Sequence, residues 1–173
     1  MGKDFHHVAL TKILGEEIWL AFTNSGVCAS EFKKLTSLSQ FRNRLQERTG
    51  KTFSKVVSMP ENMEKAIRQW NIHGYSSDLN FDISSFSLFQ QKVWNRCSQI
   101  PLGETSTYSE IAISINHPKA QRAVGSALGA NPVPVLIPCH RVLRNDGGLG
   151  GYAYGSRLKE LLLARENYAK VLD

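Results

Sequence analysis

The apolar segment Val133–Val142, with the sequence VPVLIPCHRV, constrains the fold more than any other feature of this 173-residue chain. A short apolar run of this kind is typical of a buried strand or of a tightly extended loop. The segment ends on Cys139 and His140, so it delivers a thiol and an imidazole together. We therefore expect the chemistry of this chain to centre on Cys139.

Basic residues surround Cys139 in the sequence. A cysteine in an apolar site is normally an inert, small hydrophobic residue. Four basic side chains stand near this one, however: His140, Arg141, Arg144 and Arg122. They predict an electropositive setting, which lowers a thiol pKa and favours the thiolate. Because adjacent side chains on an extended chain point to opposite sides, His140 would need a turn or a bridging water to act on Cys139.

A carboxylate that could orient His140 lies on the predicted C-terminal helix. We expect this helix to follow Ser156 as N-cap and to run to about Ala169. Glu166 shares its apolar face with Leu162, and a carboxylate in such a place is rarely left unpaired. Glu166 therefore either pairs with a histidine or is an exposed charge at the end of the helix.

Cys139, His140 and Glu166 form a candidate set of nucleophile, base and orienting group. The residues alone leave the reaction open, because a cysteine hydrolase would use the same set. A hydrolase turns over many times, whereas a protein that accepts a group onto its own thiol acts once. The hydrolase interpretation leaves two further features unexplained, a pair of short helices and a basic C-terminal half.

The helix pair precedes the cysteine segment. Thr107 and Glu110 match a capping box, so the first helix should begin at Tyr108 and end near residue 115. Pro118 suits the first position of the second helix, which Gly129 should end. Two short helices joined by a tight turn are a helix-turn-helix candidate, with an ordinary helical hairpin as the alternative.

Small side chains dominate the second helix, AQRAVGSA at residues 120–127. Gly125 inside this helix costs about 1 kcal/mol relative to alanine, so something should compensate. A helix with side chains is about 10–12 Å wide and the DNA minor groove about 6 Å, so a helix entering that groove needs such a stripped face. Tight packing on another helix is the alternative. Arg122 is the one long charged side chain on this helix. In the simplest interpretation it is an ordinary arginine exposed to solvent.

The charge and cysteine content narrow the class of protein. The net charge is +6 and the isoelectric point about 9.3; residues 86–173 carry 10 basic and 6 acidic side chains. This surplus favours an anionic partner, with nucleic acid first. Three widely spaced cysteines form neither a disulfide framework nor a zinc pattern. With no apolar run that could span a membrane and no signal-like N-terminus, we expect an intracellular protein.

The first half of the chain is predicted to be mixed α/β and ends near Ser84-Ser85. The pattern predicts a hairpin of residues 8–14 and 17–22 around Gly15-Glu16, helices over 31–48 and 63–70, and strands over 56–57 and 79–83. A helix over 86–98 follows, with Cys97 on its apolar face. The fold class is therefore α+β, with an α/β domain at 1–85 and a mainly helical domain at 86–173.

Several ordered motifs resemble the O6-alkylguanine-DNA alkyltransferases, also called methylated-DNA–protein cysteine methyltransferases. The segment IPCHRV at 137–142 is similar to the active-site motif of that family. The resemblance extends from about residue 89 to residue 166, and the first 85 residues show no signature. The other matching motifs are FQQKVW at 89–94, IPLGET at 100–105, Thr107-Tyr108, Pro118–Gly125 with Arg122 inside it, GANP at 129–132 and GGY at 150–152.

The resemblance implies a role for each catalytic residue. Cys139 would accept the alkyl group from O6-alkylguanine, and also from O4-alkylthymine, in a single turnover. His140 would deprotonate the thiol through a water, and Glu166 would orient His140. Tyr108 would donate its phenolic proton toward N3 of the leaving guanine, and Asn131 would brace the loop before the active site. No metal or cofactor is implied.

The resemblance also implies how DNA is held. The target atom faces into the duplex, so the base must leave the stack through the minor groove. Arg122 would fill the space left by the flipped nucleotide. The other implied DNA-binding residues are Thr107, Ala123, Gly125 and Ser126, and the implied pocket residues are Pro134, Val142, Tyr152 and Ala153. The backbone carbonyls of Cys139 and Val142 would bind the exocyclic amine of guanine.

One departure from the family pattern follows Tyr152. This chain has Ala153-Tyr154-Gly155 where some members have Ser-Gly, and the main-chain N–H of Ala153 would then contact the O6 oxygen. The implied fold of the first domain is ribonuclease H-like, and the implied partner is double-stranded DNA, bound by a monomer. Two alternative functions remain. The first is a damage sensor that only binds the lesion, which the presence of Cys139 disfavours. The second is a helix-turn-helix regulator, which would need several base-reading side chains where this helix has only Arg122 among small residues.

Overall fold

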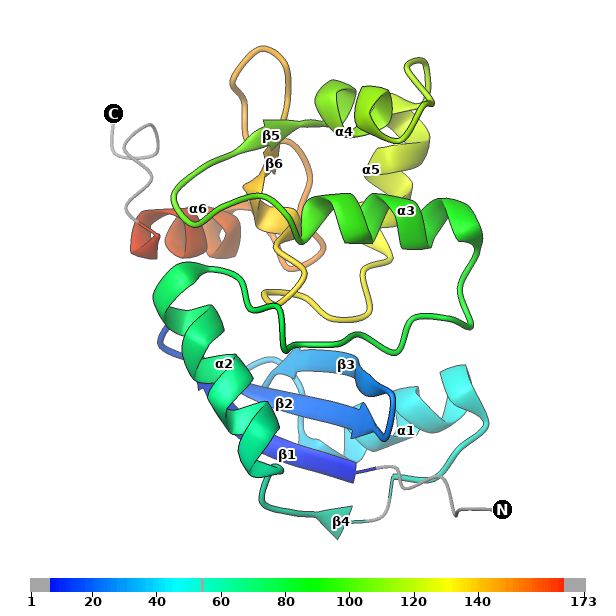
Figure 1. Ribbon diagram of the computed structural model, residues 1–173, viewed down its shortest axis with the longest axis vertical. Helices are drawn as coiled ribbons and strands as arrows, with labels where there is room; N and C mark the ends of the chain where they lie inside the picture. The colour runs from blue at the N-terminus through cyan, green and yellow to red at the C-terminus, as the bar shows by residue number, and fades with distance from the viewer. Residues whose placement is uncertain (1–6, 54, 167–173) are drawn as a thin grey trace. The chain divides into compact units, whose positions relative to one another are not determined.

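The computed structural model describes residues 7–53 and 55–166 (Figure 1). The chain divides into two compact units. The first unit comprises Met1–Ile72, Ser76–Ile83 and Pro132–Pro134, and the second comprises His73–Tyr75, Ser84–Asn131 and Val135–Asp173. Among the described residues, no helix is both long and apolar enough to cross a membrane.

A four-stranded sheet with the order β3-β2-β1-β4 forms the centre of the first unit. β1 (His7–Ile13), β2 (Glu16–Thr23) and β3 (Gly26–Phe32) pair antiparallel, and β4 (Lys55–Val56) pairs parallel to β1. The predicted hairpin is confirmed, but its turn is Leu14-Gly15 and Glu16 already belongs to β2. Both turn residues have positive φ, 48° and 76°, which matches the twist of a tight two-residue hairpin.

Two helices cover the sheet, with α2 (Glu61–His73) in front of it and α1 (Leu38–Thr49) behind it in Figure 1. The core beside α1 is built from the buried residues Val8, Ala21, Cys28, Ala29, Phe41, Leu45 and Phe53. The side chain of Trp70 on α2 is also buried.

The helix predicted over residues 31–48 begins too early. Phe32 is the last residue of β3, and α1 starts only after Ser37, whose side chain forms a capping box with Gln40. The apolar spacing of Phe32 and the residues after it imitates a helical face, but Phe32 is fully buried in the sheet. The strand predicted over 79–83 is likewise reduced to one bridge, between Phe81 and Val27.

Up to residue 166, where the described part of the chain ends, the second unit contains four helices, a short turn and a two-stranded parallel sheet. The helices are α3 (Leu88–Cys97), α4 (Tyr108–Ser114), α5 (Gln121–Gly129) and α6 (Ser156–Arg165). The sheet pairs β5 (Ser106–Thr107) with β6 (Val142–Leu143). The indole N–H of Trp94 donates to the carbonyl of Ala127 at 2.8 Å, which fixes α3 against α5. Cys97 is fully buried, as predicted.

The predicted helix boundaries in this unit are partly right. The capping box of Thr107 with Glu110 is confirmed at the start of α4. Pro118 does not begin the next helix, because the backbone first closes a turn from Ala120 back to His117, and α5 starts at Gln121. The N-cap of α6 is Gly155, whose φ of 88° is unfavourable for other residues, and not Ser156. Residues 167–169 of the predicted C-terminal helix lie outside the described residues.

Candidate active site around Cys139

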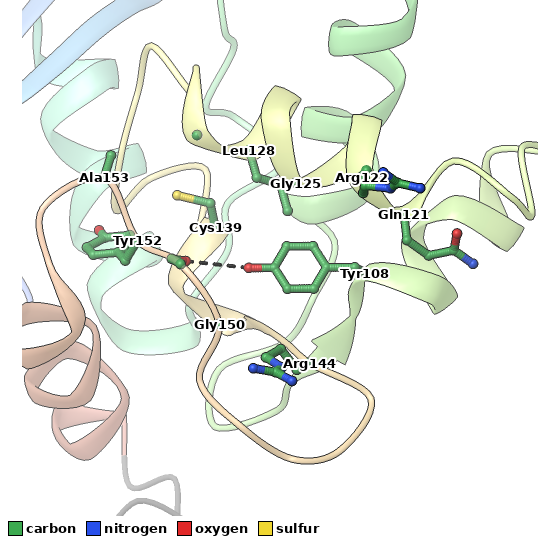
Figure 2. Close-up of a pocket in the computed structure, with 12 residues that line it drawn as sticks. Tyr108, Gln121, Arg122, Gly125, Leu128, Cys139, Arg144, Gly150, Tyr152 and Ala153 are labelled. Carbon is green, nitrogen blue, oxygen red and sulfur yellow. Dashed lines mark hydrogen bonds between the residues drawn. The ribbon is translucent and has the colours of Figure 1, made fainter.

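A cavity of about 730 Å³ in the second unit opens above Cys139 (Figure 2). The thiol-bearing residue is only 8% exposed, so it is reached through this cavity. The cavity is lined by Tyr108, Gln121, Arg122, Gly125, Leu128, Gly129, Cys139, Arg144, Gly150, Gly151, Tyr152 and Ala153. It therefore gathers one nucleophile, two tyrosines and two arginines from four separate stretches of the chain.

The segment that delivers Cys139 is buried and strained. Val133–Ile137 are all fully buried or nearly so, and Cys139–Arg141 form a single 3₁₀ turn before β6. Val135 has a φ of 75°, a conformation that costs a β-branched residue of the order of 1–3 kcal/mol and that clusters near functional sites. Because Cys139 and His140 lie in this turn and not on an extended strand, their side chains are not forced to point to opposite sides.

The side-chain amide of Asn131 contacts the thiol directly. Its Nδ2 donates to Cys139 Sγ at 3.2 Å and to the carbonyl of Ile137 at 2.8 Å. Burial raises the pKa of Cys139, while the hydrogen bond from Asn131 and the nearby charge of Lys159 act in the opposite direction. The predicted lowering of the thiol pKa by its basic neighbours in the sequence is therefore wrong, because desolvation outweighs the nearby charge.

His140 and Glu166 form a buried pair beside the cysteine. The imidazole Nε2 lies 2.8 Å from Glu166 Oε1, and the two side chains are 0% and 1% exposed. Burial lowers the pKa of His140 although Glu166 pulls it upward, so the imidazole is neutral at pH 7. His140 Nδ1 is buried and has no hydrogen-bond partner among the described protein atoms. The bond from Nε2 to Glu166 thus fixes the orientation of the imidazole ring, and Nδ1 is available to accept a proton.

Arg141 binds the same carboxylate from the other side. Its Nε donates to Glu166 Oε2 and its Nη2 to Oε1, both at 2.9 Å, while Nη1 donates to the carbonyls of Gly74 and Ile100 at 3.1 and 2.6 Å. The positive charge predicted to act on Cys139 is therefore neutralised by Glu166. Burial alone would raise the pKa of Glu166, but the hydrogen bonds from His140 and Arg141 hold it below its ordinary value.

Lys159 belongs to this site, and sequence reasoning missed it. Its side chain is 0% exposed, and its ammonium donates to the carbonyls of Val142 at 2.7 Å, of Gly151 at 3.4 Å and of Leu149. Burial lowers its pKa to about 8, against the opposing influence of the Cys139 and Cys97 thiols. The signal in the sequence is a lysine next to Leu158 on the apolar side of the last helix.

Replacing Lys159 should destabilise the second unit and slow the chemistry of Cys139. Lys159→Met leaves the buried carbonyl of Val142 and the partly buried carbonyls of Leu149 and Gly151 without their donor. A buried carbonyl costs about 1–3 kcal/mol if no water replaces the donor, so we expect a total loss of about 2–4 kcal/mol. The loss of a nearby cation should also move the pH midpoint of thiol alkylation upward. Urea unfolding and the rate of iodoacetamide modification against pH measure the two effects, with exposed Lys33→Met as control. Unchanged values in both would contradict the assignment.

Tyr108 faces Cys139 across the cavity (Figure 2). Its hydroxyl donates to the carbonyl of Gly151 at 3.4 Å. Burial and the Cys139 thiol raise the pKa of Tyr108, so the phenol keeps its proton at pH 7. A Cβ on Gly150, which has a φ of 69°, would come within 2.8 Å of this hydroxyl, while one on Gly125 would only touch the ring at 3.7 Å. A side chain at residue 150 would therefore collide with the phenol of Tyr108.

The remaining predicted residues fall into two groups. Arg122, Gly125, Tyr152 and Ala153 line the cavity. The others do not, and they are placed as follows: Ala123 and Ser126 are exposed on α5, Thr107 caps α4, Val142 is fully buried on β6, and Pro134 belongs to the first unit, where its carbonyl accepts from Ser30. Gln121 and Lys159 are added by the structure, whereas Arg144, predicted only as a basic neighbour of Cys139, lines the cavity. Within the described part of the chain, no His, Cys, Asp or Glu side chains gather in a group that could hold a metal ion.

Comparison with known families identifies this arrangement. Residues 88–168 match the family model described as the DNA-binding domain of 6-O-methylguanine DNA methyltransferase. A methylated-DNA–protein-cysteine methyltransferase of Methanosarcina acetivorans is 43% identical over 113 residues, which cover 64% of this chain and 72% of the relative. The chain therefore belongs to the methylated-DNA–protein-cysteine methyltransferase family.

Sequence similarity is concentrated in the second unit. The Methanosarcina barkeri protein of the same name is 55% identical over 78 residues, which cover 45% of this chain and 49% of that protein. An inducible enzyme of the same name from Bacillus subtilis is 53% identical over 81 residues, covering 47% of this chain and 45% of the relative. Such alignments span only about half the length of these relatives.

Solved structures match over almost the whole chain. The crystal structure of O6-methylguanine methyltransferase from Mycobacterium tuberculosis has a TM-score of 0.70 and 30% sequence identity, covering 94% of this chain and 93% of that one. A structure from the same organism in complex with DNA has a TM-score of 0.68 and 29% identity, covering 96% and 99%. The similarity of fold therefore extends into the first unit, where the sequence carries no motif.

Proposed function

We propose that this protein repairs O6-alkylguanine in double-stranded DNA by transferring the alkyl group to Cys139. The observation that carries the proposal is a thiol at the bottom of a cavity, contacted by the Asn131 amide and adjacent to the buried pair of His140 and Glu166. The substrate class follows from family membership, and O4-alkylthymine presents the same kind of exocyclic oxygen. The protein acts as a monomer inside the cell, where its three free cysteines stay reduced.

The transfer is a displacement at the alkyl carbon. His140 takes the proton of Cys139 through a water at Nδ1, and Glu166 keeps the imidazole in place. The thiolate forms a bond to the alkyl carbon while the bond from that carbon to O6 breaks, and the electron pair passes into the guanine ring. Tyr108 donates its proton to N3 of the leaving base. Because a thioether is a stable product, each molecule acts once.

A site at the bottom of a cavity requires the base to leave the helix. A cavity of about 730 Å³ can accept one nucleobase but not a base pair in a stack. The proposed minor-groove surface is the exposed face of α5, where Arg122 replaces the flipped nucleotide. Further contacts come from the small residues Ala123, Gly125 and Ser126 on α5 and from Thr107. Tyr152 and the N–H of Ala153 shape the guanine pocket.

Two features of the architecture belong to the proposal as well. We assign the domains to residues 1–85 and 86–173, although residues 73–75 and 84–85 belong to the second compact unit and residues 132–134 to the first. The first domain resembles ribonuclease H. The strand order β3-β2-β1-β4, with three antiparallel strands followed by one parallel strand, supports the resemblance to ribonuclease H. The pair α4 and α5 serves as a helix-turn-helix.

Transfer of a labelled methyl group tests the proposal. Duplex DNA carrying O6-[methyl-³H]methylguanine is incubated in excess with the wild-type protein and, separately, with Cys139→Ser. We expect label on the wild-type protein at one methyl per chain and none on the variant. If both proteins bind the lesion and neither takes label, the chain is a sensor of damage. If label is released into solution over many turnovers, it is a hydrolase.

Alkylation should lower the stability of the protein. The added methyl group enters a site where Cys139 is 8% exposed and displaces the hydrogen bond from Asn131. Overpacking of this kind costs about 1–3 kcal/mol, which corresponds to a drop of about 3–10 °C in melting temperature. Calorimetry before and after reaction with methylated DNA measures it, and Cys139→Ser mixed with the same DNA is the control. A midpoint that stays or rises would contradict this expectation.

A further inference from the structure

Arg144 has no role in the transfer described above, although it lines the same cavity. It follows β6 and begins a loop that reaches Gly151, and its side chain is 62% exposed. Its stem and the phenol both lie close to Gly150, since a Cβ there would come within 3.3 Å of Arg144 Cγ and 2.8 Å of the Tyr108 hydroxyl. In Figure 2 the guanidinium of Arg144 lies on one side of Tyr108 and that of Arg122 on the other. The cavity mouth therefore has two separate cations.

The loop holds Arg144 in a defined place. Its N–H donates to the carbonyl of Gly148 at 2.8 Å, and its carbonyl accepts from Gly147 at 3.0 Å. Asp146 Oδ1 accepts from the N–H of Gly148 at 3.0 Å, and Gly147 has a φ of 82° that favours glycine. A tight turn closed by these bonds keeps the base of the arginine fixed at the rim.

Asp146 also holds the guanidinium itself. Its Oδ2 lies 2.7 Å from Arg144 Nη2, and both side chains are largely exposed, at 62% and 59%. Exposed ion pairs of this kind contribute little, so a stronger anion can replace the carboxylate at small cost. Asp146 thus orients the guanidinium in the free protein without binding it tightly.

The chemistry of the substrate supplies such an anion at this place. When a base occupies the cavity, its sugar and the flanking phosphates must lie at the mouth. A guanidinium binds a phosphate through two parallel hydrogen bonds, a better geometric match than a single contact with a carboxylate oxygen. Arg122, the other cation at the mouth, is occupied within the base stack in the proposed function.

We propose that Arg144 binds a backbone phosphate next to the flipped nucleotide, taking that phosphate in place of Asp146. The contact reads no sequence; it holds the extruded nucleotide in the cavity and adds to the affinity for any duplex. This inference rests on the proposed function. It makes the loop 144–151 a part of the DNA-binding surface, together with α5.

Two charge variants test the contact. Arg144→Gln should weaken binding of a duplex containing O6-methylguanine by about tenfold at low salt and reduce the slope of log affinity against log salt by about 1. Asp146→Asn should strengthen binding by about twofold to threefold, because it removes the competitor. Arg68→Gln is the matched control, since it removes the same charge from an exposed position of the first unit. An affinity of Arg144→Gln equal to that of Arg68→Gln would overturn the proposal.

Neutral phosphate analogues locate the contact. Single methylphosphonates are placed in turn at the phosphates around O6-methylguanine, and binding of the wild type and of Arg144→Gln is compared. A methylphosphonate at one position should weaken DNA binding by the wild type and leave binding by Arg144→Gln unaffected. Equal losses of affinity for both proteins at every position would exclude a direct contact. Label transfer to the wild type from the unmodified duplex is measured in parallel. A wild type that binds but takes no label refutes the proposed function and leaves the phosphate contact to be judged by binding alone.

Discussion

Glu166→Ala is expected to destabilise the protein by about 3–5 kcal/mol and to reduce the rate of alkyl transfer by about 10²–10⁴. The reason is that one carboxylate serves two partners. Removing it leaves the fully buried guanidinium of Arg141 without its counter-charge and releases the imidazole of His140. Thermal or urea unfolding measures the first effect, and single-turnover transfer measures the second.

A double variant separates stability from chemistry. In Arg141→Met with Glu166→Gln, both members of the buried ion pair are neutral, so a large part of the lost stability should return. The rate should stay low, because the amide carries no charge to support an imidazolium at His140. If the single variant Glu166→Ala unfolds at the same denaturant concentration as the wild type, the network described here is not energetically significant.

The same network predicts how the wild type responds to acid. The folded pKa of Glu166 lies below its ordinary value, so its contribution is complete above about pH 4.3 and is lost as the pH falls through the folded pKa. His140 is buried in its neutral form, and its lowered pKa means that the unfolded chain takes up a proton first. Stability should therefore already decrease below about pH 6.5. In His140→Asn, the loss of stability that begins below about pH 6.5 should become smaller.

Tyr108→Phe is expected to slow transfer by about 10²-fold while leaving lesion binding and stability almost unchanged. The ring still packs beside Gly125, and the lost hydrogen bond to the Gly151 carbonyl is long, at 3.4 Å. In the proposed mechanism, only the proton for the leaving guanine is then missing. Single-turnover kinetics at saturating DNA measure the rate, and competition binding measures the affinity.

A second tyrosine of the cavity provides the matched control. The hydroxyl of Tyr152 is buried without a hydrogen-bond partner among the described protein atoms. Tyr152→Phe removes the same atom from the same cavity, and the transfer rate should stay within about threefold of the wild type, since no proton passes from this residue. If both tyrosine variants slow the reaction equally, the effect belongs to the polarity of the cavity and not to a proton donor.

Local sequence signals predicted some elements well because their causes are local. The capping box of Thr107 with Glu110 sets the start of α4 through bonds between residues three apart. The hairpin of β1 and β2 follows from two β-rich runs around a glycine. Where a periodic pattern has two physical explanations, as at Phe32, it predicts the wrong element, since burial in a sheet and burial on a helix both select apolar residues.

The candidate site shows the same division. Cys139, His140, Glu166 and Tyr108 could be named from the chain, because their types and motifs are visible there. The direction of the thiol pKa could not, since it depends on how completely the site is desolvated and on which cation faces it. Arg141 is only two residues from the cysteine in sequence but is bound by Glu166, whereas Lys159 is distant in sequence and influences the thiol.

By itself, the sequence determined the class of this protein: its basic C-terminal half, its helix pair and its ordered motifs around one cysteine all lie in short stretches of the chain. Only the tertiary structure decided the electrostatics of the site and the identity of its supporting residues. Desolvation and ion pairing depend on side chains from α5, α6 and the loops that meet around one cavity. Their energies are properties of that enclosure, and no single segment of the chain contains them.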